Sequence, residues 1–472
     1  MNKKISIAVC SVLLGALIAV GMTACDKTDT PADTDIPTVT ETEPATEPTT
    51  EVTTVEEETT EEATTEEETT LSLKDQIGLD VKDEDLKEIM QNIFSGTQSL
   101  RETVMFLDKG DVKELLYPIS SVISVTSYDG KIVYEEGKDY VVADGKLKVT
   151  ADSAIRCITA DKYYNSPSSI IKTKNPATGQ MVPTYWGESM IKQWQVSVTY
   201  THDTAWEGFV QESQLEVYQN LVKKLVAGED VTVFFYGDSI TWGACASFHE
   251  NAAPKQGSYA MLFTEALADL FGYTVKYINT GIVGSVNNSG MPCASVPATD
   301  YVGGERGTIT YVNTAIGGWT STDGINNFDK HVKAPFETYG CDLFVLAYGM
   351  NDGGITARRN AANMKDMASK MYELNPDAAV MFVATMTPHM GSNWDHVSIG
   401  QQEAELIKQA EKLREDGKVC AVACVNSLSK SIQEHKTFND YSGNNINHPN
   451  DWFYRVYAQT LLQTLIGYEN MN

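Results

Sequence analysis

One serine in this chain has a setting that could support nucleophilic chemistry. Residues 236–239 read Tyr-Gly-Asp-Ser and directly follow the apolar residues 231–235. Such an apolar stretch predicts a buried strand, and a glycine turn leading into a helix would lift the hydroxyl of Ser239 out of the backbone. A base could reach the hydroxyl there, and a helix N-terminus could stabilise negative charge. Because Gly, Asp and Ser also form ordinary turns, this run alone indicates little.

Three later segments supply the residue types that such a serine needs. Residues 312–318 run from a strand-like stretch into a glycine pair that ends at Gly318, and residues 343–351 form an apolar strand that ends at Asn351. His448 follows near the C-terminus. A histidine can take the proton of a serine, and a glycine N–H or an amide can donate to an oxyanion. Serine, glycine, asparagine and histidine thus follow one another along the chain, each at a strand or loop terminus.

The four segments together resemble the four blocks of the SGNH hydrolases, also called the GDSL esterase family, over roughly residues 231–467. The resemblance implies that Ser239 is the nucleophile and His448 the base. It also implies that the N–H groups of Ser239 and Gly318 and the side chain of Asn351 are oxyanion donors. The implied fold is a doubly wound, three-layer α/β domain of the flavodoxin-like type. The implied chemistry needs no metal and no organic cofactor.

The chain departs from the family at the acid of the triad. The family usually has Asp three residues before the histidine, whereas this chain has Asn445. An amide can accept a hydrogen bond but supplies no charge to an imidazolium. We therefore expect a Ser-His dyad in which Asn445 or a main-chain carbonyl orients His448. Asp440 and Asp451 are weaker candidates for a displaced acid.

The oxyanion glycine has a rival in the sequence. Residues 278–285 repeat much of the pattern that surrounds Gly318. We prefer Gly318 because Trp319 and the two residues after it continue the block that the family has at this place.

Tryptophans follow three of the four blocks. Trp242 lies after Ser239, Trp319 after Gly318, and Trp452 after His448. With Trp394 they could form a substrate-binding platform on which sugar rings stack. Packing around the loops is an equally good interpretation of these aromatic side chains.

Residues 1–25 predict a secretory signal with a lipid-attachment site. Lys3 and Lys4 precede the apolar residues 5–20, and residues 22–25 read Met-Thr-Ala-Cys, which resembles a bacterial lipobox. We expect Cys25 to carry lipid and to anchor the protein at the cell surface, on the outer face of the cytoplasmic membrane. An ordinary cleaved signal is the alternative. The apolar run is shorter than the roughly 20 residues that a membrane-spanning helix needs.

Residues 26–70 predict a disordered linker. They consist almost entirely of Thr, Glu, Asp, Pro and Ala, with 16 acidic residues against one lysine. This segment has too little apolar surface to offset the entropy of ordering, so it would act as an extended tether. The whole chain has a formal net charge of -28, which makes nucleic acid an improbable partner because phosphate binding needs clustered Lys and Arg.

The remaining chain divides into two expected domains. Residues 71–219 show short alternating runs separated by the hairpin signals Asp129-Gly130 and Asp144-Gly145, which favour a β-sandwich-like accessory domain. This domain could bind carbohydrate through its aromatic residues or could only pack against the catalytic domain. Residues 220–472 alternate strands with helices, which is typical of a parallel α/β sheet. In such sheets the ligand crevice lies beyond the carboxyl ends of the strands.

The cysteines do not predict a metal site. Outside the first 25 residues no Cys-x-x-Cys occurs, and we expect most of the cysteines to be buried and reduced. Cys245 and Cys293 are the candidate pair for one disulfide outside the cell.

The sequence as a whole predicts an extracytoplasmic serine esterase that removes O-acetyl or other short acyl groups from polysaccharide. A lipase or thioesterase that acts on acyl chains is the first alternative. A non-catalytic, glycan-binding surface protein on a degenerate hydrolase fold is the second, and Asn445 gives it some support.

Overall fold

The computed structural model describes residues 93–175, 177–185, 188–279 and 296–467. The signal, Cys25, the tether, most of the rival glycine segment and Cys293 lie outside these ranges, so the predictions made on them stay predictions. All described residues belong to one compact unit, Leu71–Asn472. Within the described ranges, no helix is both long enough and apolar enough to cross a membrane.

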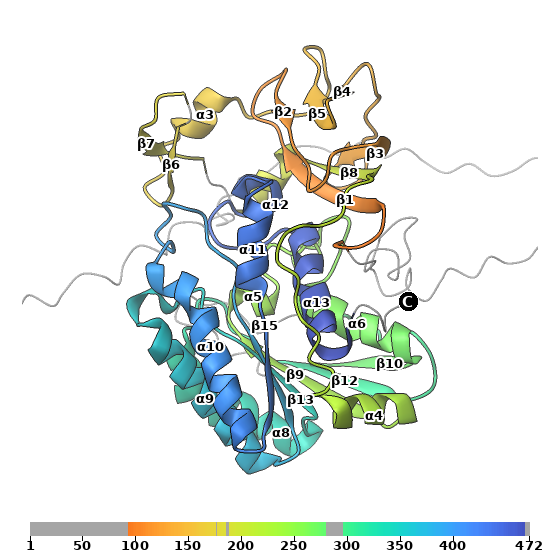
Figure 1. Cartoon of the computed structure of the whole chain (residues 1–472), viewed down its shortest axis with the longest axis vertical. Coiled ribbons are helices and arrows are strands. Elements are labelled where there is room, and N and C mark those ends of the chain that lie inside the picture. The colour runs from red at the N-terminus through yellow and green to blue at the C-terminus, as the bar shows by residue number, and fades with distance from the viewer. Residues whose placement is uncertain (1–92, 176, 186–187, 280–295, 468–472) are drawn as a thin grey trace, which may run out of the picture. The chain divides into compact units, whose positions relative to one another are not determined.

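The C-terminal part of the chain is built on a seven-stranded sheet with the order β11-β10-β12-β9-β13-β14-β15. Figure 1 labels five of its strands, β9, β10, β12, β13 and β15. All neighbouring strands run parallel except β10 and β11. The strands are β9 (Val231–Gly237), β10 (Thr274–Ile278), β11 (Tyr301–Val302), β12 (Thr308–Asn313), β13 (Leu343–Ala347), β14 (Ala379–Val383) and β15 (Val419–Ala423). The predicted parallel α/β sheet is therefore confirmed.

Helices cover both faces of this sheet. Successive residues of each strand point to opposite faces and so pack against different helices. Val233 and Phe235 of β9 belong to one core, together with residues of α6 (Tyr259–Phe271) and α13 (Asp451–Ile466). Phe234 and Tyr236 belong to the other core, together with residues of α9 (Ala357–Leu374) and α10 (Val397–Glu415). Strands β9, β13 and β14 are buried on both faces, which explains their nearly continuous apolar sequences.

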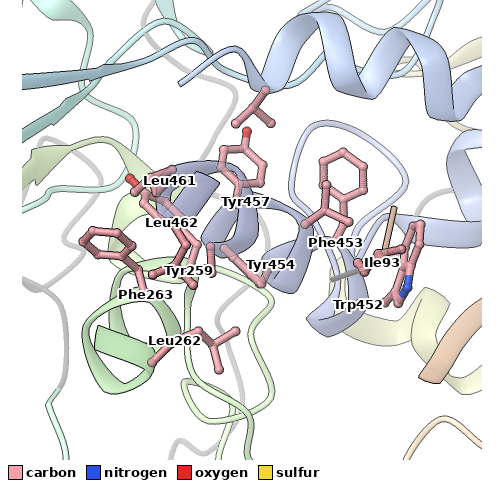
Figure 2. Close-up of a cluster of buried hydrophobic side chains, with 14 of the residues drawn as sticks. Ile93, Tyr259, Leu262, Phe263, Trp452, Phe453, Tyr454, Tyr457, Leu461 and Leu462 are labelled. Carbon is pink, nitrogen blue, oxygen red and sulfur yellow. The ribbon is translucent and has the colours of Figure 1, made fainter. Parts of the chain in front are cut away.

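Helix α13 lies at the centre of the first core. Every residue of α13 is buried. Figure 2 shows Tyr454, Tyr457 and Leu461 of this helix close to Tyr259 of α6. The helix begins at the N-cap Asn450, whose side chain accepts a hydrogen bond from the backbone N–H of Phe453.

Shorter helices connect these elements. In chain order they are α3 (Ala160–Tyr164), η1 (Glu188–Trp194), α4 (Gln219–Ala227), α5 (Ser239–Trp242), α7 (Ser321–Asn326), η2 (Asp329–Lys333), α8 (Ala334–Tyr339), η3 (Asp352–Gly354), α11 (Val425–Gln433) and α12 (Phe438–Tyr441). The sequence predicted none of them apart from a helix directly after the serine turn.

The region before α4 contains antiparallel sheets, as the hairpin signals predict. One sheet has the order β1-β8-β3, a second β2-β5-β4, and β6 pairs with β7. The strands are β1 (Gln98–Met105), β2 (Val112–Lys113), β3 (Ser121–Ser127), β4 (Tyr140–Ala143), β5 (Lys146–Val149), β6 (Lys172–Lys174), β7 (Met181–Pro183) and β8 (Gln195–Thr201). Asp144 and Gly145 join β4 to β5 with φ angles of 52° and 71°, which is the left-handed geometry of a two-residue hairpin.

Strands β1 and β8 contact the segment that leads to His448. The backbone N–H of Met105 donates to Asp440 Oδ1 at 2.8 Å, and Gln195 Nε2 donates to the carbonyl oxygen of Ser442 at 2.8 Å. Glu102 and Lys436 form a fully buried ion pair of 2.6 Å. The antiparallel region therefore helps to fix the loop on which the candidate base lies.

Candidate active site

The nucleophile candidate lies at the junction of β9 and α5. Asp238 is the N-cap of α5, and its carboxylate accepts a hydrogen bond from the N–H of Ile240 at 3.0 Å. Ser239 is the first residue of this helix, so its N–H has no intrahelical partner and can serve an oxyanion. Gly237 has a structural reason to be glycine, because a Cβ there would lie 2.6 Å from the carbonyl oxygen of Ala347.

Ser239 and His448 are in contact, as the sequence predicts. Ser239 Oγ lies 2.7 Å from His448 Nε2, which is hydrogen-bonding distance. Burial of the imidazole lowers the pKa of His448 from 6.5 to about 4, so the ring is neutral near pH 7. A neutral imidazole beside a serine hydroxyl can act as a general base when its Nε2 carries the lone pair.

Asp238 connects the serine turn to the strand that carries Asn351. Its carboxylate accepts from the backbone N–H groups of Ile240 and Met350, and only 1% of the residue is exposed. Burial raises the pKa of Asp238 to about 7. Asp238 therefore holds the two loops in register.

The predicted oxyanion residues follow β12 and β13, the two strands that flank β9. Gly318 is exposed and has a φ of 78°, and its N–H has no acceptor among the described residues. Asn351 Nδ2 donates one hydrogen bond to the carbonyl oxygen of Trp319 at 3.0 Å. The amide nitrogen carries two hydrogens, so one donor of Asn351 remains for an oxyanion.

Two residues orient the oxyanion side: Trp394, which the sequence suggested only as part of a stacking platform, and Asp352, to which the sequence assigned no role. Trp394 Nε1 donates to Asn351 Oδ1 at 3.2 Å, which fixes the amide with its nitrogen toward the carbonyl of Trp319. Asp352 accepts from the backbone N–H of Ser321 at 3.1 Å and from its hydroxyl at 2.6 Å, which ties the loop of Gly318 to the end of β13. The position of Asp352 directly after Asn351 is the one signal that could have indicated its role.

The histidine side differs from the prediction in one residue. Asn445 does not contact the imidazole, and Asn444 takes that position: Asn444 Nδ2 lies 2.8 Å from His448 Nδ1. Asn444 also closes the loop, because its Oδ1 accepts the backbone N–H groups of Ile446, Asn447 and His448 at 2.9, 3.0 and 3.0 Å. Amide hydrogen bonds therefore build this loop.

Asn445 points into the antiparallel region. Its Nδ2 donates to the carbonyl oxygen of Tyr185 at 2.6 Å and to the hydroxyl of Tyr163 at 3.1 Å. The main-chain carbonyl oxygen of Asn445 lies 2.8 Å from His389 Nδ1. The residue has a φ of 57°, a left-handed conformation that asparagine tolerates, and this turn directs its side chain away from His448.

Neither candidate for a displaced acid reaches the imidazole. Asp440 is buried and accepts from Met105, Lys113 and Thr437. Asp451 Oδ1 accepts from the backbone N–H of Ser247 at 2.8 Å. Within the described ranges, no carboxylate is hydrogen-bonded to His448.

The three predicted substrate tryptophans have different environments. Trp452 is only 1% exposed and belongs to the core in Figure 2, so its prediction as a stacking platform is corrected. Trp242 and Trp319 are half-buried. The ring of Trp319 packs edge-on against His331 at 4.7 Å, and that of Trp242 against His249 at 4.3 Å. These two tryptophans keep some exposed surface beside the site.

Three of the described cysteines lie in the core. Cys341, Cys420 and Cys424 are buried, and burial raises the pKa of each thiol, which keeps it protonated. Among the residues that the structure describes, no group of His, Cys, Asp and Glu side chains is arranged to hold a metal ion.

Comparison with known proteins identifies the domain. A family model described as GDSL-like lipase/acylhydrolase matches residues 233–460, which contain Ser239, Gly318, Asn351 and His448. This match confirms the resemblance predicted from the four blocks. No curated protein matches the chain.

Several solved structures are similar to this chain at low sequence identity. A two-domain esterase active on acetylated mannans is 17% identical with a TM-score of 0.37, over 55% of this chain and 54% of that one. An α/β hydrolase from the metagenome of Lake Arreo, Spain, is 14% identical with a TM-score of 0.34, over 50% and 96%. A catalytic mutant of an acetylxylan esterase from Geobacillus stearothermophilus is 14% identical with a TM-score of 0.34, over 50% and 94%. The chain thus spans about half the length of the two-domain esterase, and the family assignment rests on the family model.

Proposed function

We propose that this chain, which carries a domain of the GDSL-like lipase/acylhydrolase family, is an extracytoplasmic serine esterase that removes O-acetyl or other short acyl groups from polysaccharide. The observation that carries the esterase proposal is the 2.7 Å contact between Ser239 Oγ and His448 Nε2. The oxyanion donors Gly318 and Asn351 follow β12 and β13, the strands on either side of β9. The other parts of the proposal have weaker support and separate tests.

The geometry supplies each step of ester cleavage. Ser239 Oγ attacks the ester carbonyl, and its proton passes to Nε2 of His448 when that nitrogen carries the lone pair. The N–H groups of Ser239 and Gly318 and the unused hydrogen of Asn351 Nδ2 stabilise the oxyanion of the tetrahedral intermediate. His448 returns the proton to the alcohol as it leaves, and the same base then activates a water that hydrolyses the acyl-enzyme. No step calls for a metal or an organic cofactor.

Polysaccharide as the carrier of the acyl group is supported by aromatic side chains at the site. Trp319 and Trp394 are half-buried and flank Asn351, where the face of an indole ring can stack on a sugar. The mannan and xylan esterases named above act on acetylated polysaccharides by their own descriptions, and we extend that substrate class to this chain as part of the proposal.

Labelling and turnover test the esterase directly. The purified protein should react with a fluorophosphonate probe and should hydrolyse p-nitrophenyl acetate, and Ser239→Ala should lose both properties. Equal labelling of the wild type and the variant would refute the assignment of the nucleophile. Acetylated xylan and mannan, compared with p-nitrophenyl esters of increasing chain length, would separate a polysaccharide deacetylase from a lipase or thioesterase. A preference for long acyl chains would favour the latter.

The extracytoplasmic location is a proposal from the sequence of residues 1–25. Cys25→Ala should release the full chain from the membrane fraction of a bacterial host that lipidates such signals, whereas Cys157→Ala should not. Membrane association of Cys25→Ala equal to that of the wild type would rule out Cys25 as the anchor.

A glycan-binding protein without catalysis is the second candidate function. The observation that favours it is that His448 contacts an amide and no carboxylate among the described residues. Binding of acetylated polysaccharide by a wild-type protein that neither labels nor turns over ester would select this candidate.

A further inference from the structure

The amide of Asn444 has one possible orientation. Its Oδ1 accepts three backbone N–H groups, those of Ile446, Asn447 and His448, at 2.9 to 3.0 Å. A flipped amide would place N–H against N–H at three contacts and lose three hydrogen bonds. Asn444 Nδ2 also donates to Asn447 Oδ1 at 3.0 Å. The nitrogen of Asn444 is therefore the atom that faces His448.

This orientation determines where the imidazole carries its proton. An amide nitrogen only donates, so Nδ1 of His448, 2.8 Å from Asn444 Nδ2, must accept. A neutral imidazole that accepts at Nδ1 carries its hydrogen on Nε2. We infer that Asn444 is a positioning residue that holds His448 with its proton on Nε2, and that this tautomer limits the turnover of the enzyme.

The consequence for catalysis follows from the proton balance, and it rests on the proposed esterase function. With hydrogen on Nε2, the ring donates to Ser239 Oγ and has no lone pair there for the serine proton. To act as a base, the ring must first lose the Nε2 proton to solvent and gain one at Nδ1. The Nδ1–H then faces the N–H of Asn444. In a serine protease triad, an amide in place of the carboxylate keeps the geometry and lowers kcat by about 10⁴-fold through the wrong tautomer.

A carboxylate at position 444 should reverse this effect. One oxygen of Asp in Asn444→Asp can accept the same three backbone N–H groups, which keeps the loop closed, and the other can accept Nδ1–H of His448. The amide of Asn447, whose Oδ1 now accepts from Asn444, can rotate and donate to the carboxylate. In Asn444→Asp, the group that faces Nδ1 of His448 therefore changes from a donor into an acceptor. The other groups that contact residue 444 keep a hydrogen-bond partner.

Nitrogen NMR of the full chain with ¹⁵N-labelled histidine tests the tautomer without any assay of activity. The His448 signals are assigned by their absence in His448→Gln. In the wild type we expect a protonated Nε2 and a lone pair on Nδ1, and in Asn444→Asp a protonated Nδ1. The matched control is Asn447→Asp, which adds the same charge to the loop but keeps an acceptor for Asn444 and should retain the wild-type pattern. A protonated Nδ1 in the wild type would overturn the inference.

Kinetics test whether the tautomer limits turnover. We expect Asn444→Asp to raise kcat for p-nitrophenyl acetate by about 10²-fold or more, with KM nearly unchanged because Asn444 does not face the substrate. Asn447→Asp should show no such gain. If the proton moves to Nδ1 in Asn444→Asp but kcat rises less than tenfold, the claim that Asn444 limits turnover is overturned.

The two proposals fail in different ways. If no variant hydrolyses ester but the NMR pattern is as expected, the esterase function is wrong and the assignment of Asn444 to the Nε2–H tautomer stands. If the wild type is an active esterase with Nδ1 protonated, the esterase function stands and the assignment of Asn444 is wrong.

Discussion

Ser239 and Asn351 follow the carboxyl ends of the neighbouring parallel strands β9 and β13, whereas His448 lies in a loop of amide side chains that β1 and β8 support. On the serine side, the sheet fixes the backbone, and the order of residues along each strand decides which side chain reaches the site. On the histidine side, the position of a side chain depends on single loop dihedrals. Spacing in sequence therefore predicts which side chain reaches the site on the serine side, but it does not do so on the histidine side.

The sharpest test of the serine side is removal of the nucleophile. Ser239→Ala should lower kcat for p-nitrophenyl acetate by on the order of 10⁴-fold or more, since the hydroxyl is the attacking group. Ser239 Oγ bonds only to His448 among the described residues, so the fold should be preserved. Circular dichroism and the melting temperature provide the control. Activity of more than a few per cent of the wild type would break the assignment of this side.

The oxyanion donor at the end of β13 should have the next largest effect. Asn351→Ala should lower kcat by about 10²- to 10³-fold, the usual loss for one oxyanion donor. KM should change little, because the donor acts on charge that develops in the transition state. A rise in KM with an unchanged kcat would make Asn351 a residue that binds the ground state.

The pH profile addresses the histidine side. His448 serves as a base only when neutral, and burial places its pKa at about 4. As the pH falls through about 4 the ring becomes protonated, so kcat/KM should fall about tenfold per pH unit below that point. Circular dichroism over the same range separates this loss from acid unfolding. An acidic limb near 6.5 that persists in Asp238→Asn would show a solvated imidazole instead, because burial places the pKa of Asp238 at about 7.

A smaller change concerns the orientation of Asn351. Trp394→Phe removes the N–H that donates to Asn351 Oδ1 and keeps an aromatic ring in place. The loss of one such hydrogen bond costs about 0.5–1.5 kcal/mol, so kcat should fall about 2- to 10-fold. In the background of Asn351→Ala the same change should have no further effect on kcat, because the group it orients is absent. Additive losses would mean that Trp394 acts on the substrate directly.

The difference between the two sides also explains how far the sequence could predict the molecule. Apolar runs predicted the central strands β9 and β13 because both faces of the sheet are buried there, and the strand ends then placed Ser239 and Asn351. The hairpin of Asp144 and Gly145 was predictable because only a few residue types tolerate its dihedrals.

What the sequence could not predict depends on contacts between distant segments. Trp452 is four residues after His448, yet α13 turns it into the core, 5.3 Å from the ammonium group of Lys436. The role of Asn444 follows from the φ of 57° at Asn445, which no spacing rule predicts. A family motif counted in residues therefore identified the correct loop and the wrong asparagine.

The last and smallest effect concerns Asn445, where the chain departs from the family spacing. If position 445 were a weakened triad site, Asn445→Asp would raise kcat by supplying charge to the imidazolium. The side chain instead donates to the carbonyl oxygen of Tyr185 at 2.6 Å, and a carboxylate there would face that oxygen without a hydrogen. We therefore expect kcat to stay flat or to fall, with a loss of stability of about 1–3 kcal/mol from the unsatisfied carbonyl.

Turnover of Asn445→Asp and the midpoint of its urea unfolding check this expectation, and Asn444→Asp provides the direct comparison at the neighbouring position. The two variants carry the same added charge one residue apart. A gain in kcat confined to Asn444→Asp would therefore show that the gain depends on contact with Nδ1 of His448 and does not come from the added negative charge alone. A tenfold gain in kcat of Asn445→Asp would mean that the loop can turn the side chain of residue 445 toward the imidazole. The contrast between a serine side fixed by the sheet and a histidine side fixed by loop dihedrals would then be wrong.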